Sequence, residues 1–118
     1  MQADRLRSSL SFSEVFEEGC TVVGRFVVLH YLPSGRSRPR VGFAAGKKLG
    51  GAVLRNRLRR VLKEAFRHLQ GELLPADVVL VARRRMSQAA FSEIQDDLSR
   101  LLSRAGLLQS EASNSTSD

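Results

Sequence analysis

The sequence has little cysteine, no tryptophan and no long apolar run. Its single cysteine, Cys20, excludes an intramolecular disulfide and any metal site built from several thiolates. The longest uninterrupted apolar run, residues 78–82, is too short to cross a bilayer, and the N-terminal residues lack the apolar core of a signal peptide. These absences predict a cytoplasmic protein that does not associate with a membrane.

Acidic residues are scarce in the middle of the chain. The 118 residues include 19 Lys and Arg against 12 Asp and Glu, which gives a net charge of +7. Within residues 36–67 the only acid is Glu64, so the excess of positive charge is concentrated there and the remainder is slightly acidic. An arginine-rich stretch of this density suits a polyanion whose phosphates accept bidentate guanidinium contacts. Nucleic acid is therefore the leading partner.

The apolar spacing predicts a small α/β protein. We expect a short helix over residues 11–18, a strand over 21–32 covered on both faces, and a strand over 40–45 that pairs with it as a hairpin. A helix over 52–69, a strand over 78–82 and a last helix ending near residue 104 follow. The order α-β-β-α-β-α implies a two-layer α+β sandwich in which one helix connects the second and third strands.

The length and composition are typical of one domain. We expect residues 1–107 to form it and the polar residues 108–118 to be a disordered tail.

The helix over 52–69 has two different faces. At 100° per residue its leucines fall on one arc, while the opposite arc carries cations and one asparagine. Such a face could simply be exposed to solvent, with no binding role. Closely spaced cations repel one another, however, and a polyanionic partner would relieve that repulsion. The outward-facing residues are Arg55, Asn56, Arg59, Arg60, Lys63 and Arg67, with Arg57 at the far edge.

The sequence gives little support for catalytic residues. The run GFAAGKK at residues 42–48 departs from a nucleotide-binding loop in its spacing and in the residue after the lysine. Glu93, Asp96 and Asp97 could hold a metal, yet a solvated helix face is the favoured interpretation because no further ligand motif points to them. The sequence predicts neither a catalytic side chain nor a metal site of its own.

Phe12 and Phe16 lie four residues apart in the first predicted helix. Apolar residues at this spacing more often face a core. Aromatic rings also hold single-stranded nucleic acid by stacking, so a binding role stays open.

One stretch identifies a resemblance. The run KKLGGAVLRNRLRRVLKE at residues 47–64, with its Arg-Asn-Arg motif on a helix, resembles the signature of the protein subunit of bacterial ribonuclease P. Leu6, Phe12, Val15, Phe16 and Gly19 resemble the first helix of that family, Arg40-Val41-Gly42 its second strand, and Ala82-Arg83 the end of its third.

The resemblance implies a fold with an uncommon left-handed crossover and a ribonucleoprotein that removes the 5′ leader from precursor tRNA. In that enzyme the RNA subunit performs the phosphodiester hydrolysis with Mg2+, and the protein binds the catalytic RNA and the leader. DNA is not an implied partner. The implied contacts to the catalytic RNA are Lys47, Lys48, Arg55, Asn56, Arg57, Arg59, Arg60 and Lys63; those to the leader are Phe12, Phe16, His30, Arg55 and Asn56.

The sequence leaves two alternatives open. One is a ribosomal protein that binds rRNA through the same arginine-rich helix, and the other is a nuclease that acts without an RNA subunit. Leader removal that requires added catalytic RNA would separate the ribonuclease P interpretation from both.

Overall fold

The computed structural model of the chain describes residues 1–109. In this part of the chain three α-helices surround a five-stranded sheet, and none of them is long and apolar enough to span a membrane. The helices are α1 (Ser9–Glu18), α2 (Ala52–Arg67) and α3 (Phe91–Arg104). The sheet consists of β1 (Asp4–Arg5), β2 (Cys20–Val23), β3 (Val27–Pro33), β4 (Arg40–Ala44) and β6 (Ala76–Ala82).

The sheet has the strand order β1-β4-β6-β3-β2. The expected hairpin between the first two long strands is therefore wrong, because β6 lies between β3 and β4, antiparallel to β3 and parallel to β4. Every residue of β6 except Val81 is buried. A strand this apolar is most stable in the middle of the sheet, where both of its faces are covered.

As the sequence predicted, a helix, α2, connects β4 to β6. The structure adds that these two strands are parallel neighbours in the sheet. The mixed α+β sandwich of the prediction is confirmed. The left hand of this crossover stays an expectation from the resemblance.

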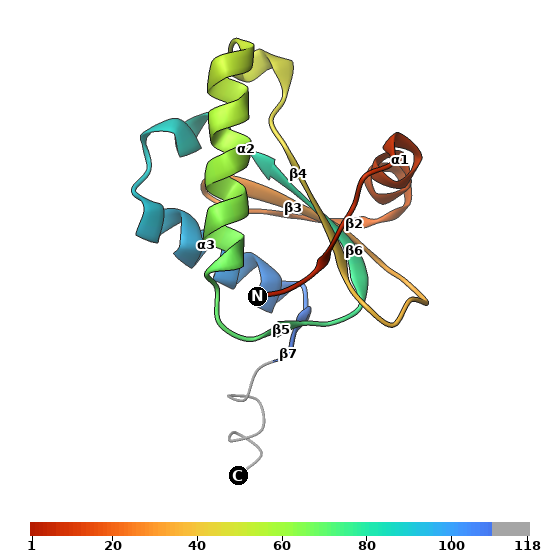
Figure 1. Ribbon diagram of the computed structural model, residues 1–118. Coiled ribbons are helices and arrows are strands. Elements are labelled where there is room, and N and C mark those ends of the chain that lie inside the picture. Colours follow the sequence, from red (N-terminus) through yellow and green to blue (C-terminus); the bar gives the residue numbers. More distant parts are fainter. Residues whose placement is uncertain (110–118) are drawn as a thin grey trace.

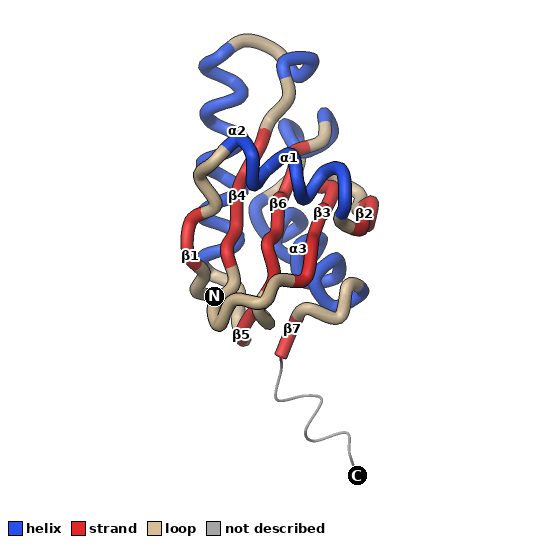
Figure 2. The backbone as a smooth tube through the Cα atoms, turned by 90° about the vertical axis from the view of Figure 1, so that its right-hand side faces the viewer, coloured by secondary structure: helices blue, strands red, loops and turns tan. Residues whose placement is uncertain are grey.

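Helices cover both faces of the sheet (Figure 1). Helices α2 and α3 pack on one face, where the main core includes Leu29, Leu62, Leu80 and Leu98. Helix α1 crosses the other face (Figure 2), above a smaller cluster of Leu6, Val15 and Val79. The apolar arc of each helix thus faces the sheet, as amphipathic spacing requires.

The strand predicted over 21–32 is in fact two strands, β2 and β3, joined by a tight turn. The carboxylate of Asp97 in α3 accepts hydrogen bonds from three backbone N–H groups of this turn: Arg25 at 3.1 Å, Phe26 at 2.8 Å and Val27 at 3.1 Å. Asp97 is only 3% exposed. The expectation of a solvated face is therefore wrong for Asp97, which satisfies N–H groups that burial would otherwise leave without partners.

The predicted tail begins too early. Leu108–Gln109 forms β7, which pairs antiparallel with β5 (Glu72–Leu73). The remainder of the predicted tail, residues 110–118, lies outside the described residues.

Candidate nucleic-acid interface

Helix α2 separates apolar from cationic side chains. Leu58, Leu62, Ala65 and Phe66 are buried against the sheet and α3. The opposite side of the helix is exposed, and it includes Asn56, Arg57, Arg60 and Lys63, while Arg55 and Arg59 are half-buried along one edge. The leucine face fixes the helix so that its cations point to solvent.

Among the described residues, most cations of this surface have no acidic partner. Glu64, the only acid of α2, forms an ion pair with Arg67 at 2.9 Å, and this hydrogen bond lowers the pKa of the Glu64 carboxyl. Asn56 accepts a hydrogen bond from the guanidinium of Arg59. We call the following set the basic face: Lys47, Lys48, Arg55, Asn56, Arg57, Arg59, Arg60 and Lys63. Within residues 1–109 none of the cations in this set forms an ion pair.

The two lysines lie on a short 3-10 helix, Lys47–Leu49, immediately before α2. Gly50 has a φ of 145°, which side-chain-bearing residues rarely adopt, and it allows the chain to turn into α2. The Arg84 guanidinium donates to the Lys48 carbonyl oxygen at 3.1 Å. Sequence reasoning missed this contact, which fixes the lysine segment against the end of β6.

The predicted aromatic residues form a cluster on the other face of the sheet. The rings of Phe12 and Phe16 are 6.4 Å apart, and the His30 ring meets Phe16 edge-on at 4.9 Å. His30 also shares a 3.1 Å hydrogen bond with the hydroxyl of Thr21, and its partial burial lowers the pKa of the imidazole. Phe16 is 44% exposed. The cluster therefore offers an accessible aromatic edge rather than a closed core.

A row of small apolar side chains extends the surface beside this cluster. Val23 pairs with Val28, Val28 with Val81, and Val81 with Ala44, so all four point to the face that α1 crosses. Val23 is 58% exposed and the other three are half-buried. The aromatic cluster and this row together form what we call the α1 face. The sequence did not predict this row, because its residues come from four different strands and form no periodic pattern along the chain.

The residues predicted to contact the leader do not all lie on one surface of the structure. Phe12, Phe16 and His30 lie together on the α1 face, whereas Arg55 and Asn56 belong to α2 in the opposite layer (Figures 1 and 2). The chain leaves β4 at Ala44 and enters α2 eight residues later. The first turns of α2 therefore follow the end of the sheet at which the apolar row lies.

Several carboxylates of the described chain have structural partners. Asp97 binds the β2–β3 turn, Glu93 accepts from the Ala90 N–H at 2.9 Å, and Asp77 is held by Arg40 at 2.6 Å. Asp4 pairs with Arg38. Within residues 1–109 no group of three or more His, Cys, Asp or Glu side chains is placed to hold a metal.

Comparison with known proteins gives one family. The family model for ribonuclease P matches residues 1–106. The ribonuclease P protein component of Symbiobacterium thermophilum is 43% identical over 112 residues, which cover 93% of this chain and 97% of the relative. That of Caldanaerobacter subterraneus is 37% identical over 106 residues, covering 89% and 91%.

Solved structures agree in fold. The ribonuclease P protein of Staphylococcus aureus superposes with a TM-score of 0.79 at 28% identity, covering 92% of this chain and all of the other. The protein from Thermotoga maritima gives 0.73 at 28% identity, covering 86% and 96%. Because the family model matches residues 1–106 and relatives of 37–43% identity cover about nine-tenths of the chain, this chain belongs to the family of ribonuclease P protein components.

Proposed function

We propose that the protein binds the catalytic RNA of ribonuclease P through the basic face and the 5′ leader of precursor tRNA through the α1 face. Acting in the cytoplasm, it would assist the removal of that leader to give the mature tRNA 5′ end. The observation that carries the proposal is the separation of two different surfaces. The basic face presents cations that have no ion-pair partner within residues 1–109, and aromatic and apolar side chains lie across the sheet from it.

The basic face supports the first contact. Guanidinium groups without acidic partners can pair with phosphates without breaking an ion pair first. Family membership favours the ribonuclease P interpretation of this face over the ribosomal one.

The α1 face supports the second contact. A leader is single-stranded, and its bases can stack on exposed rings such as Phe16 irrespective of sequence. The apolar row beside the rings has no hydrogen-bonding side chain with which to read base edges. Arg55 and Asn56, in the first turns of α2, would meet the leader only where it leaves this row, near the end of β4.

The four carboxylates with structural partners, Asp4, Asp77, Glu93 and Asp97, are poorly suited to hold magnesium. Mg2+ prefers oxygen ligands, and the acids named above are occupied by backbone N–H groups or by arginine. In this proposal the RNA subunit therefore holds the magnesium and performs the hydrolysis, and the side chains of the protein bind and orient RNA.

Reconstitution tests the proposal. Precursor tRNA carrying a labelled leader is incubated with magnesium and with the protein, the catalytic RNA, or both. We expect removal of the leader at the mature 5′ end only in mixtures that contain the catalytic RNA. The catalytic RNA with the protein should bind the precursor more tightly than the catalytic RNA alone. Mature tRNA, which has no leader, is the matched substrate and should bind equally well with and without the protein.

Two results would contradict the proposal. Cleavage by the protein in the absence of catalytic RNA would make it a nuclease in its own right. Unchanged affinity for the precursor on adding protein to the RNA would remove the leader contact.

A further inference from the structure

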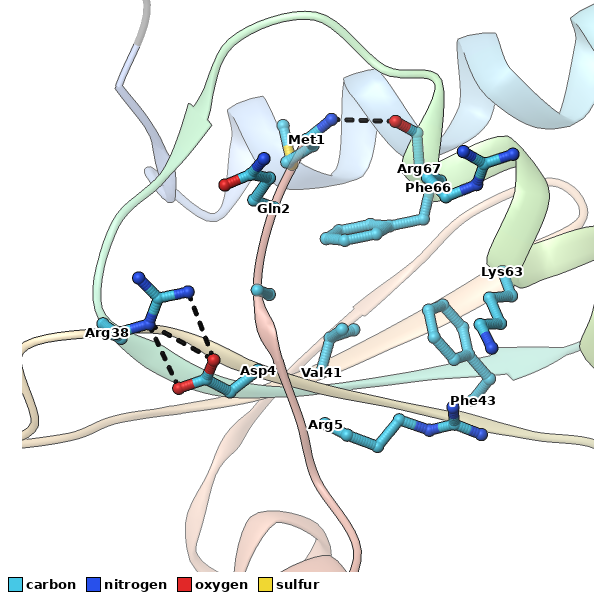
Figure 3. A pocket seen from close by; sticks show the side chains of 11 residues that line it. Met1, Gln2, Asp4, Arg5, Arg38, Val41, Phe43, Lys63, Phe66 and Arg67 are labelled. Carbon is cyan, nitrogen blue, oxygen red and sulfur yellow. Dashed lines mark hydrogen bonds and ion pairs between the residues drawn. The ribbon is translucent and has the colours of Figure 1, made fainter.

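A pocket of about 610 Å3 lies beside the basic face, between β1 and the last turns of α2. The side chains of Arg5, Arg38, Phe43, Lys63, Phe66 and Arg67 line it (Figure 3). Its volume lies within the range of roughly 300–1,000 Å3 that is usual for pockets holding a small molecule or a comparable group. The pocket is on the same face of the sheet as α2 and is therefore separate from the α1 face.

The cations of this pocket are not equally available. Arg38 pairs with Asp4 at 3.2 Å, and Arg67 pairs with Glu64 at 2.9 Å. Arg5 and Lys63 have no ion-pair partner within residues 1–109. The acids beside the pocket are thus neutralised, while the side chains of Arg5 and Lys63 are without an acidic partner in the described part of the chain and can bind an anion.

The free cations flank an aromatic ring. Figure 3 shows Arg5 reaching from β1 and Lys63 from α2 towards Phe43. Phe43 is half-buried and meets the ring of Phe66 edge-on at 5.8 Å. Phe66 is only 3% exposed and belongs to the core, so Phe43 is the ring that a ligand could reach.

The pocket continues a line of cations. Arg55, Arg59 and Lys63 follow one another at intervals of four residues, so they lie along one edge of α2. Arg5 extends that line from the helix onto β1, which reaches the pocket from a distant part of the sequence. A continuous track of positive charge of this kind fits a polynucleotide backbone better than an isolated small anion.

We infer that this pocket holds one nucleotide of the catalytic RNA, with a phosphate between Arg5 and Lys63 and the base against Phe43. The inference rests on the proposed function, and it adds Arg5 and Phe43 to the RNA-binding surface. A cation beside a half-buried ring at the wall of a pocket provides the two contacts that an unstacked nucleotide requires.

Binding of the catalytic RNA to charge-matched variants tests the inference. Arg5→Ala should weaken the affinity about tenfold, as expected for a charge-assisted hydrogen bond, and should reduce the salt slope by about one. Arg7→Ala is the matched control, because Arg7 is an exposed cation two residues further along the chain that does not line the pocket. It should change the affinity less than about twofold.

A second pair of variants tests the proposed contact between the base and Phe43. Phe43→Leu keeps an apolar contact with Phe66 but removes the ring, and should weaken binding about tenfold, whereas Phe43→Tyr should retain it. The melting temperature of each variant shows whether folding has changed. Chemical probing of the bound RNA should reveal one nucleotide that is protected by the unaltered protein and exposed with Arg5→Ala.

Equal affinities for Arg5→Ala and Arg7→Ala, or an unchanged protection pattern, would overturn the inference. The unaltered protein's support of leader removal, measured in parallel, separates this outcome from failure of the proposed function. If leader removal is normal and Arg5→Ala has no effect, only the pocket assignment fails.

Discussion

The ring of Phe12 lies directly over Gly42. A Cβ atom at position 42 would come within 2.8 Å of Cε1 of that ring, closer than real contacts allow. The small residues of β4 thus determine how closely α1 approaches the sheet, and with it where the aromatic cluster lies.

Gly42→Ala should therefore displace Phe12 and α1. Overpacking of this kind costs about 1–3 kcal/mol of the free energy of unfolding, which denaturant titration measures. Affinity for long-leader precursor should also fall, while affinity for the catalytic RNA should not. Gly35→Ala is the control, because a Cβ at position 35 meets nothing within 4 Å. Equal stability of the two variants would show that α1 does not depend on this contact.

Phe16→Ala should weaken precursor binding in proportion to leader length. Stacking contributes about 1–3 kcal/mol per base only where a base is present to stack. Binding of precursors with a very short and a long leader, with catalytic RNA saturating, measures the difference. An equal loss on both substrates together with a lower melting temperature would assign Phe16 to packing instead.

Affinity for the catalytic RNA should depend strongly on salt. Each phosphate neutralised by the basic face releases counterions, so the logarithm of the affinity should fall linearly with the logarithm of salt concentration. Arg57→Ala and Arg60→Ala should each cost about 1 kcal/mol or more of binding free energy. Arg36→Ala, in the exposed loop before β4, should cost much less. A flat salt dependence would show that α2 is not the docking surface.

The carboxylates of α3 should separate into two kinds. Glu93→Gln and Asp96→Asn should leave the single-turnover cleavage rate within about threefold at saturating protein and magnesium. Asp97→Asn should instead lower stability by about 1–3 kcal/mol, because an amide presents N–H donors to the donors of the β2–β3 turn. A rate loss of two or more orders of magnitude in any of them, in folded protein, would make these groups catalytic.

His30 should make folding sensitive to acid. Its burial lowers the pKa of the imidazole below the ordinary 6.5, so on acidification the unfolded chain takes up this proton before the folded chain does. The stability contribution is therefore present above pH 6.5 and is lost as pH falls towards the folded-state pKa. Melting temperatures between about pH 7.5 and pH 5.5 should fall less for His30→Phe than for the unaltered protein. Parallel curves would show that His30 is equally protonated in both states.

Local periodicity was sufficient for the helices. The spacing of Leu58, Leu62 and Phe66 predicted α2 and its cationic face, with an end only two residues from the observed one. Such patterns hold because the neighbours on a helix face are three or four residues apart in sequence. The Arg-Asn-Arg motif lies on this helix, so the sequence also located the basic face and its family resemblance.

Only the tertiary structure decided which strands are neighbours and which distant side chains meet. The placement of β6 between β3 and β4 buries both faces of this apolar strand. The strands and helices that cover it are distant in sequence, so a local pattern does not show which strands are its neighbours. The binding of Asp97 to the β2–β3 turn joins residues more than 70 positions apart. Arg5 and Lys63 line the same pocket for the same reason. The sequence by itself determined the faces of the helices, because those are local, while packing of the sheet determined which of those faces and strands share a surface.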